Sequence, residues 1–231
     1  MLDCRSISCA SKGEGMRYSH YIFDLDGTLI DSFEDIFRAL RGSSQQVGVT
    51  PPSQEQVRAL MHCKLDEMIA QLYPKDRAKH GALVAGFKEQ YDGSGFRSST
   101  LYPGVKETLR WLQERQCHLY VATNKRYGAA IVLIRKFGLQ ARFDAIIASD
   151  QRAGPRLTKA GMLLALRREH RFGRGDAVFV GDTMDDCLAA RECDLDFIMV
   201  TYGYGTLNRT DPAAAGVRTI GALSALRNDG S

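Results

Sequence analysis

The stretch YIFDLDGTLI, residues 21–30, decides how the rest of the chain is interpreted. It begins with the apolar residues of a buried strand and places two aspartates, Asp24 and Asp26, where that strand would end. Side chains alternate along a strand, so both carboxylates would point to the same side. Two like charges so close repel each other unless a positive charge lies nearby. The stretch therefore predicts a site at this strand end that includes a cation.

Four further apolar, β-rich runs predict a sheet. They are CHLYVATN (117–124), FDAIIASD (143–150), DAVFVGD (176–182) and DFIMVTYG (196–203). The segments between them have apolar residues at three- and four-residue spacing, which is typical of amphipathic helices. Near-continuous apolar strands that alternate with helices indicate an α/β protein with a Rossmann-like, mostly parallel sheet flanked by helices. Such sheets bind ligands beyond the carboxyl ends of their strands.

Polar residues stand at these carboxyl ends. The second run ends in Thr123 and Asn124, the third in Ser149 and Asp150, and the fourth in Asp182. Each one alone could be an ordinary helix cap or turn residue. Because the ends of parallel strands share one edge, their convergence favours a common site.

Residues 32–101 are far more than a single crossover helix needs. Helical periodicity over residues 32–48, 53–73 and 77–92 predicts a small all-helical cap domain there. The α/β core would then comprise residues 18–31 and 102–231. Residues 1–17 lack periodicity and are interpreted as a flexible leader, with Met16 as an alternative start. A cap above the site could close over it and exclude water.

Composition restricts the class of protein and its partners. The net charge of +4 is spread over 231 residues without a basic block, so no nucleic-acid partner is expected. No apolar run is long enough to span a bilayer, so no membrane partner is expected either. The six cysteines form no CxxC pair, which favours free thiols and a cytoplasmic protein.

Four motifs together resemble the haloacid dehalogenase superfamily. They are DLDGT (24–28), TN (123–124), Lys159 and GDTMDD (181–186), and the resemblance runs from about Tyr18 to Thr206. The helical insert is similar to the cap of phosphoglycolate phosphatases, and TNK and VTYGYG also resemble that branch. The resemblance implies a magnesium-dependent phosphatase that acts on a small phosphomonoester through an aspartyl-phosphate, with 2-phosphoglycolate as one candidate substrate.

The residue chemistry agrees with that resemblance. A carboxylate can attack phosphorus, a role we assign to Asp24, and a second one, Asp26, can protonate the leaving alkoxide and later deprotonate water. Oxygen ligands from Asp24, the Asp26 backbone carbonyl, Asp182 and Asp186 suit Mg2+. We expect Asp186 to orient a metal-bound water or the lysine. Alternatively, Asp182 and Asp186 could be acidic residues that only stabilise a helix N-terminus through its dipole. Asp185 is an alternative to Asp186 for the role of orienting the water or the lysine.

The phosphoryl group needs hydrogen-bond donors and a cation. Thr123 and Asn124 match the second family motif and would bind the phosphoryl oxygens. Lys159 is the expected cation, although GPRLTKAGML departs from the Lys-Pro-x-Pro pattern common in this branch. Arg156 is the rival, and either residue could also be a surface cation near a loop.

The cap offers two candidate specificity residues, His62 and Lys64 in MHCKLDEM, which could equally lie on a helix surface. Three alternatives to a phosphatase remain open at this point: a phosphomutase, a pyrophosphatase and a non-catalytic binding member of the fold. The expected assembly is a monomer or a homodimer.

Overall fold

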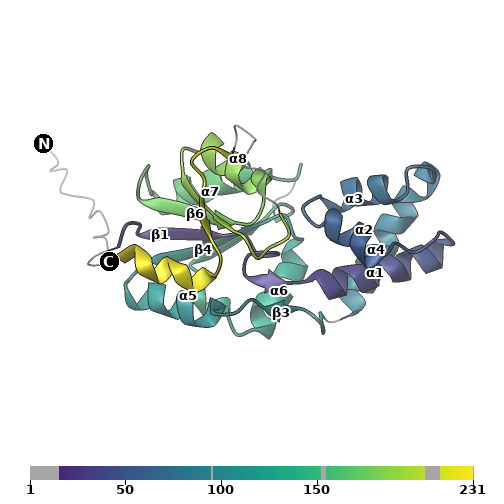
Figure 1. Cartoon of the computed structure of the whole chain (residues 1–231), viewed down its shortest axis with the longest axis horizontal. Coiled ribbons are helices and arrows are strands. Elements are labelled where there is room, and N and C mark those ends of the chain that lie inside the picture. The colour runs from purple at the N-terminus through teal and green to yellow at the C-terminus, as the bar shows by residue number, and fades with distance from the viewer. Residues whose placement is uncertain (1–15, 95, 152–154, 206–213, 231) are drawn as a thin grey trace, which may run out of the picture.

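The computed structural model describes residues 16–94, 96–151, 155–205 and 214–230. Their centre is a parallel sheet (Figure 1). Its strand order is β5-β4-β1-β6-β7-β8. The strands are β1 (His20–Phe23), β4 (His118–Thr123), β5 (Ala145–Ala148), β6 (Ala177–Gly181), β7 (Asp196–Val200) and β8 (Arg218–Ile220). The prediction of an α/β fold with a parallel sheet is confirmed. The sequence missed β8, a three-residue strand at the sheet edge, because three residues are too few for a periodicity to be recognised.

Alternate residues of β1 enter two apolar cores on opposite faces of the sheet. Tyr21 and Phe23 pack in the larger core, with α5 (Val105–Glu114), α6 (Tyr127–Lys136) and the 3-10 helix η4 (Leu223–Gly230). Ile22 packs in the second core, with α7 (Lys159–His170) and α8 (Met184–Glu192). A short 3-10 turn, η2 (Gln140–Arg142), joins α6 to β5. Burial on both faces explains why β1 is apolar almost without interruption.

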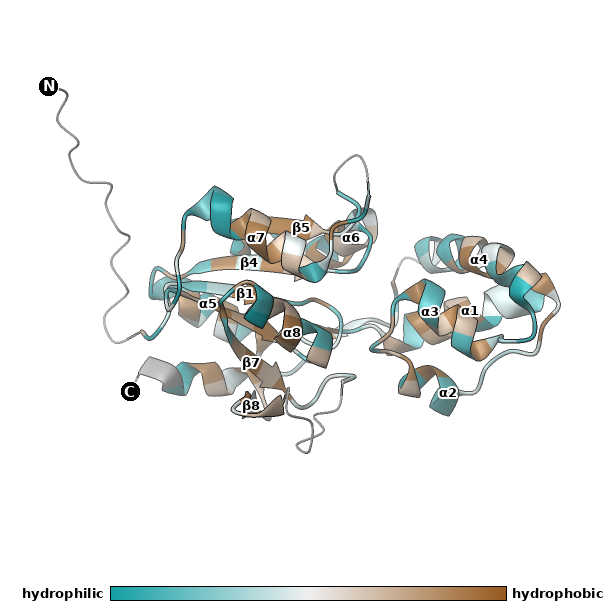
Figure 2. Cartoon of the chain, turned by 90° about the horizontal axis from the view of Figure 1, so that it is seen from above, coloured by the Kyte–Doolittle hydropathy of each residue, from teal (hydrophilic) through white to brown (hydrophobic). Residues whose placement is uncertain are grey.

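Residues 33–93 form a helical insert beside the sheet (Figures 1 and 2). It contains α1 (Phe33–Val47), α2 (Gln54–Ala59), α3 (Leu65–Leu72), the 3-10 turn η1 (Arg77–Lys79) and α4 (His80–Gly93). Two short antiparallel strands, β2 (Ile30–Asp31) and β3 (Thr100–Leu101), pair where the chain leaves and returns. The buried Asp35 carboxylate ties α1 to the returning chain, because it accepts hydrogen bonds from the backbone N–H groups of Ser98 (3.1 Å) and Ser99 (2.7 Å).

Residues 53–73, over which the sequence has helical periodicity, form two helices. α2 ends after Ala59, residues 60–64 form a turn, and α3 begins at Leu65. The Glu67 carboxylate accepts the Lys64 backbone N–H (3.4 Å), an arrangement that starts a new helix. No glycine or proline marks the break, so apolar spacing alone runs through it.

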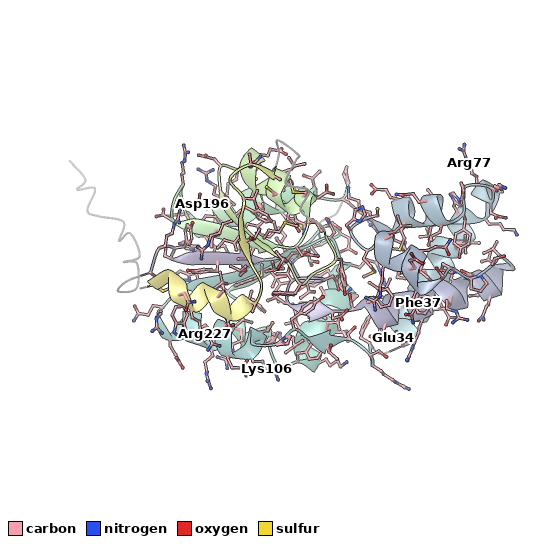
Figure 3. The ribbon with its side chains drawn as sticks, in the orientation of Figure 1. Glu34, Phe37, Arg77, Lys106, Asp196 and Arg227 are labelled. Carbon is pink, nitrogen blue, oxygen red and sulfur yellow. The ribbon has the colours of Figure 1, made fainter. Side chains whose placement is uncertain are left out.

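The helical insert and the sheet lie at opposite ends of the molecule. In Figure 3, Arg77 marks the outer end of the helical insert and Asp196 the opposite end of the sheet. Most of the predicted leader lies outside the described residues, but Met16 is buried in the larger core, so the packed chain begins before the expected boundary at residue 18. Among the described helices, none combines the length and apolarity needed to cross a bilayer.

Candidate active site

Three buried carboxylates meet at the carboxyl edge of the sheet. Asp24 directly follows β1, Asp182 directly follows β6, and Asp186 lies in the first turn of α8. Each offers an oxygen within 4.8 Å of the others. Because β1 and β6 are parallel neighbours, their ends bring Asp24 and Asp182 together. We call Asp24, Asp182 and Asp186 the acidic cluster.

Lys159 is buried against this cluster. Its ammonium nitrogen lies 2.7 Å from Asp24 Oδ1 and 3.0 Å from Asp186 Oδ1, and it donates to the Ala122 carbonyl at 3.2 Å. The lysine occupies the first position of α7, whose N-cap Thr158 accepts the Gly161 N–H through its hydroxyl. The helix start thus fixes where the lysine enters the site.

The electrostatic balance of the cluster favours a further cation. One ammonium faces three carboxyl groups, so the cluster carries two excess negative charges when all three are ionised. Burial raises the pKa of Asp24, Lys159 opposes that rise, and the carboxylates of Asp186 and Asp182 add to it. Burial alone would lower the pKa of Lys159, but Asp186 and Asp24 raise it above its usual range. An all-oxygen donor set with this excess charge fits a hard divalent ion such as Mg2+.

Two glycine-containing loops hold Asp182 in place. Its carboxylate accepts the Tyr204 backbone N–H at 2.7 Å and the Thr28 hydroxyl at 3.2 Å. Gly27 has a φ of +81°, and a Cβ there would lie 2.2 Å from Asp182 Oδ2. A Cβ on Gly203 would lie 2.4 Å from the Gly27 carbonyl. GYG at 203–205, which could be an ordinary turn by sequence, therefore packs directly on the acidic cluster.

Asp26 pairs with a lysine that sequence reasoning did not assign. Both Asp26 carboxylate oxygens accept hydrogen bonds from the Lys125 ammonium at 2.8 Å, and Oδ1 also accepts the Ser32 hydroxyl at 2.6 Å. Lys125 follows directly after Thr123 and Asn124 in the TNK stretch. That position was the available signal, but nothing in the sequence says which carboxylate the lysine would contact.

Of the other polar residues at strand ends, some line the cavity and one caps a helix. Thr123 is buried and its hydroxyl oxygen accepts the Lys125 backbone N–H at 3.1 Å, while Asn124 is exposed on the wall of the cavity described below. Ser149 lines the same cavity. Asp150 instead accepts the Tyr127 backbone N–H at 2.8 Å and so caps the start of α6.

Asp185 and Arg156, the alternatives to Asp186 and Lys159, are both exposed. Asp185 lines the cavity but is exposed, whereas Asp186 is buried, bonded to Lys159 and bonded to Thr183 through its other oxygen. Arg156 likewise lines the cavity from an exposed position, whereas Lys159 is buried. The geometry therefore separates each pair of neighbours that the sequence left open.

A cavity of about 370 Å3 opens between the sheet edge and the helical insert. His62, in the turn after α2, and Lys64, at the start of α3, both line it, so neither lies on a remote helix surface. The core contributes the acidic cluster, Asp26, Lys159 and the residues after β4. The insert contributes an apolar wall of Ile36, Met61, Leu65, Met68, Phe87 and Tyr91.

Comparison with known proteins agrees with this arrangement. Residues 21–200 match the haloacid dehalogenase-like hydrolase family. The chain is 32% identical over 204 residues to phosphoglycolate phosphatase of Vibrio cholerae, a match that covers 83% of this chain and 87% of the relative. It is 29% identical over 191 residues to a 5'-nucleotidase of Pseudomonas aeruginosa, covering 83% and 86%. The solved structure of a haloacid dehalogenase-like hydrolase from Streptococcus pneumoniae superposes with a TM-score of 0.81 at 25% identity, covering 92% of this chain and 98% of that one.

The family match covers most of the chain and includes all three residues of the acidic cluster. The chain therefore belongs to the haloacid dehalogenase-like hydrolase family and is a phosphatase-type enzyme similar to phosphoglycolate phosphatases.

Proposed function

We propose that the protein is a magnesium-dependent phosphatase that hydrolyses a small phosphomonoester through an aspartyl-phosphate on Asp24. The observation that carries the proposal is the buried acidic cluster with Lys159, at the floor of a cavity that the helical insert covers. A carboxylate is a weak nucleophile, and Lys159 holds Asp24 in place while it opposes the rise in the pKa of Asp24 that burial causes.

In the first step, a carboxylate oxygen of Asp24 attacks phosphorus and the P–O ester bond breaks. The electron pair of that bond goes to the leaving oxygen, which takes a proton from the Asp26 carboxyl group and departs as an alcohol. In the second step, Asp26 accepts a proton from water, and the water oxygen attacks the same phosphorus. The P–O bond to Asp24 breaks, inorganic phosphate leaves and Asp24 is regenerated.

Asp24, Asp182 and the Asp26 backbone carbonyl are the ligands we propose for Mg2+. When bound, the ion would neutralise phosphoryl oxygens and the excess charge of the cluster. Asp186 would act one step away, since one of its oxygens is bonded to Lys159 and the other to Thr183. Lys159 would contact the phosphoryl group while it holds Asp24.

Thr123 and Asn124 are the proposed donors to the phosphoryl oxygens. The Thr123 hydroxyl accepts a hydrogen bond from the Lys125 N–H, which leaves its proton free to point at a ligand. Both residues line the cavity beside Asp24. Residues 32–101 are proposed to act as a cap whose residues His62 and Lys64 contact the leaving group.

Two substrate classes follow from the relatives and from the cavity. 2-Phosphoglycolate is the first candidate, because several relatives are phosphoglycolate phosphatases and Lys64 could bind its carboxylate. A nucleoside 5'-monophosphate is the second, because one relative is a 5'-nucleotidase and a cavity of about 370 Å3 with an apolar wall has room for a base.

The test is phosphate release from a panel of 2-phosphoglycolate, nucleoside monophosphates, sugar phosphates and pyrophosphate, with magnesium and with a chelator. We expect magnesium-dependent release that is abolished by Asp24→Asn without a change in the circular dichroism spectrum. Release by Asp24→Asn at the wild-type rate would overturn the assigned nucleophile. Product analysis with a hexose 1-phosphate separates a phosphatase from a mutase, and a folded protein inactive on every compound would favour a binding role.

A further inference from the structure

Lys125 is a second buried lysine at the site, and the two steps above give it no task. Only 6% of its side chain is exposed. Burial would lower the pKa of its ammonium, but Asp26 and Tyr91 raise that pKa above the usual range, so Lys125 stays charged. A buried charge is costly unless it is paired, and here it is paired with the proposed acid and base of the reaction.

The contact with Asp26 fixes the direction of its carboxyl group. Lys125 bonds to both oxygens at 2.8 Å, and Ser32, at the start of the helical insert, donates to one of them at 2.6 Å. A carboxylate held from two sides has little freedom to rotate. The Asp26 side chain is still 22% exposed and lines the cavity, so it faces the space in which a leaving group would lie.

The same lysine contacts the helical insert. Its ammonium lies 4.9 Å from the centre of the Tyr91 ring, on α4, a distance at which a cation is attracted to an aromatic face. The next residue, Arg126, forms an ion pair with Asp92 of α4. Consecutive residues after β4 therefore contact consecutive residues of α4, and this pairing joins the sheet edge to the insert.

We propose that Lys125 is a positioning residue that aims the Asp26 carboxyl group at the leaving oxygen and does so when α4 is docked on the sheet edge. The inference rests on the proposed function, because it assumes that Asp26 transfers the proton. Docking of α4 brings Tyr91 over Lys125, and Lys125 in turn holds Asp26. Proton transfer would thus be efficient only with the insert closed, when water is excluded from the cavity.

This role has a kinetic signature that a phosphate-binding lysine would lack. An alkoxide needs a proton to leave, whereas the phenolate of 4-nitrophenyl phosphate leaves without one. The ratio kcat/KM reports the steps up to departure of the leaving group and does not include the second step, in which Asp26 acts as the base for either substrate. Loss of a positioned acid should therefore reduce kcat/KM for alkyl phosphates and spare kcat/KM for the aryl ester. Loss of a phosphate-binding cation would instead reduce kcat/KM for both substrates.

The experiment compares Lys125→Met with wild type on 4-nitrophenyl phosphate and on 2-phosphoglycolate, or on whichever alkyl phosphate leads the panel. We expect kcat/KM for the alkyl phosphate to fall about 100-fold and kcat/KM for the aryl ester to fall less than about 5-fold, since general acid catalysis contributes roughly 100- to 10,000-fold. Equal losses of kcat/KM on both substrates would overturn the proposal.

Four further variants keep the result interpretable. Ser32→Ala removes the other contact to Asp26 and should show a weaker form of the same split. Tyr91→Leu should show it as well, whereas Tyr91→Phe, which keeps the ring, should not. Lys136→Met is the matched control, because Lys136 also joins the sheet region to the returning chain, through the carbonyls of Phe96 and Ser99, and does not line the cavity. It should change both rates by the same factor.

Wild-type activity distinguishes failure of the proposed phosphatase function from failure of the positioning role of Lys125. If wild type releases phosphate from neither substrate, the proposed function fails. If wild type hydrolyses both and Lys125→Met shows no split between them, the phosphatase stands and the positioning role is wrong.

Discussion

Lys159 differs from the exposed cations around the cavity because it is buried and bonded to two carboxylates of the acidic cluster. Lys159→Met should lower kcat by about 100- to 1,000-fold, as expected for the loss of one preorganised charge at the reacting group. Arg156→Met, which removes an exposed cation three residues away, should change kcat by less than about 5-fold. Steady-state rates on one substrate measure both variants, and a larger loss for Arg156→Met would reverse the assignment.

Gly203 is required by its neighbours and not by its backbone angles. A Cβ at this position would lie 2.4 Å from both the Gly27 carbonyl and the Asp182 Cβ. Gly203→Ala should therefore displace Asp182, weaken the response of activity to magnesium and destabilise the fold by roughly 1–3 kcal/mol. A magnesium titration of activity and a urea unfolding curve measure the two effects.

Gly128→Ala is the control for that substitution, because a Cβ on Gly128 meets nothing within 4 Å and the residue lies in α6. Alanine is the better helix former, so Gly128→Ala should leave the magnesium response unchanged and not destabilise the fold. Equal magnesium responses in the two variants would show that Gly203 does not hold Asp182.

At the scale of elements, the sequence predicted the strands and helices in which apolar residues recur at a regular spacing. The five longer strands and the helices between them each have several residues of one period, and the parallel order then brings Asp24 and Asp182 to one edge. It could not predict contacts between side chains from separate loops, such as Lys125 with Asp26 or the Tyr204 N–H with Asp182. These depend on loop conformations that no period encodes.

The roles of the polar residues at strand ends could not be predicted from the sequence either. Asp150 and Asp182 both follow a predicted strand, yet Asp150 caps α6 and Asp182 joins the acidic cluster. The two roles use the same residue type at the same place in the pattern. What separates them is the position of each strand in the sheet, since β5 is at the edge and β6 is next to β1.

Two helices of the insert, α1 and α4, pack closely enough to require a small residue between them. A Cβ on Gly86 would lie 2.9 Å from the Ser43 hydroxyl, which donates to the Leu83 carbonyl at 2.7 Å. Gly86→Leu should force the helices apart and destabilise the insert by about 1–3 kcal/mol. We expect faster limited proteolysis within residues 32–101 than in wild type.

Gly81→Leu serves as the matched control on the same helix. A Cβ on Gly81 meets nothing within 4 Å, so a larger side chain there has room. Its proteolysis pattern should match that of wild type. Similar cleavage of both variants would mean that contact with Ser43 does not determine the stability of the insert.

At the scale of the whole molecule, the two ends of the strands carry different kinds of side chain. The carboxyl ends carry the acidic cluster, while the amino ends carry aromatic and histidine side chains. His20 stacks on His118 with ring centres 4.9 Å apart, and its Nδ1 lies 3.0 Å from the Tyr120 hydroxyl. Phe172 packs on His20 as well, at 4.8 Å. None of these four side chains lines the proposed substrate cavity, so titration of His20 should affect stability separately from catalysis.

Burial, together with smaller effects of His118 and His170, lowers the pKa of His20 from 6.5 to about 4, and Asp176 and Asp144 oppose this shift. The unfolded chain therefore binds a proton between pH 6.5 and 4 that the folded chain does not, so His20 makes stability fall as the pH falls through this window. Replacing His20 with Gln removes that dependence. The free energy of unfolding of wild type minus that of His20→Gln should decrease by on the order of 1 kcal/mol from pH 7.5 to pH 5. Urea unfolding at both pH values measures this difference, in which the opposing titration of the acidic cluster cancels because both proteins share it. A difference that stays constant with pH would show that His20 is protonated in the folded protein at pH 5.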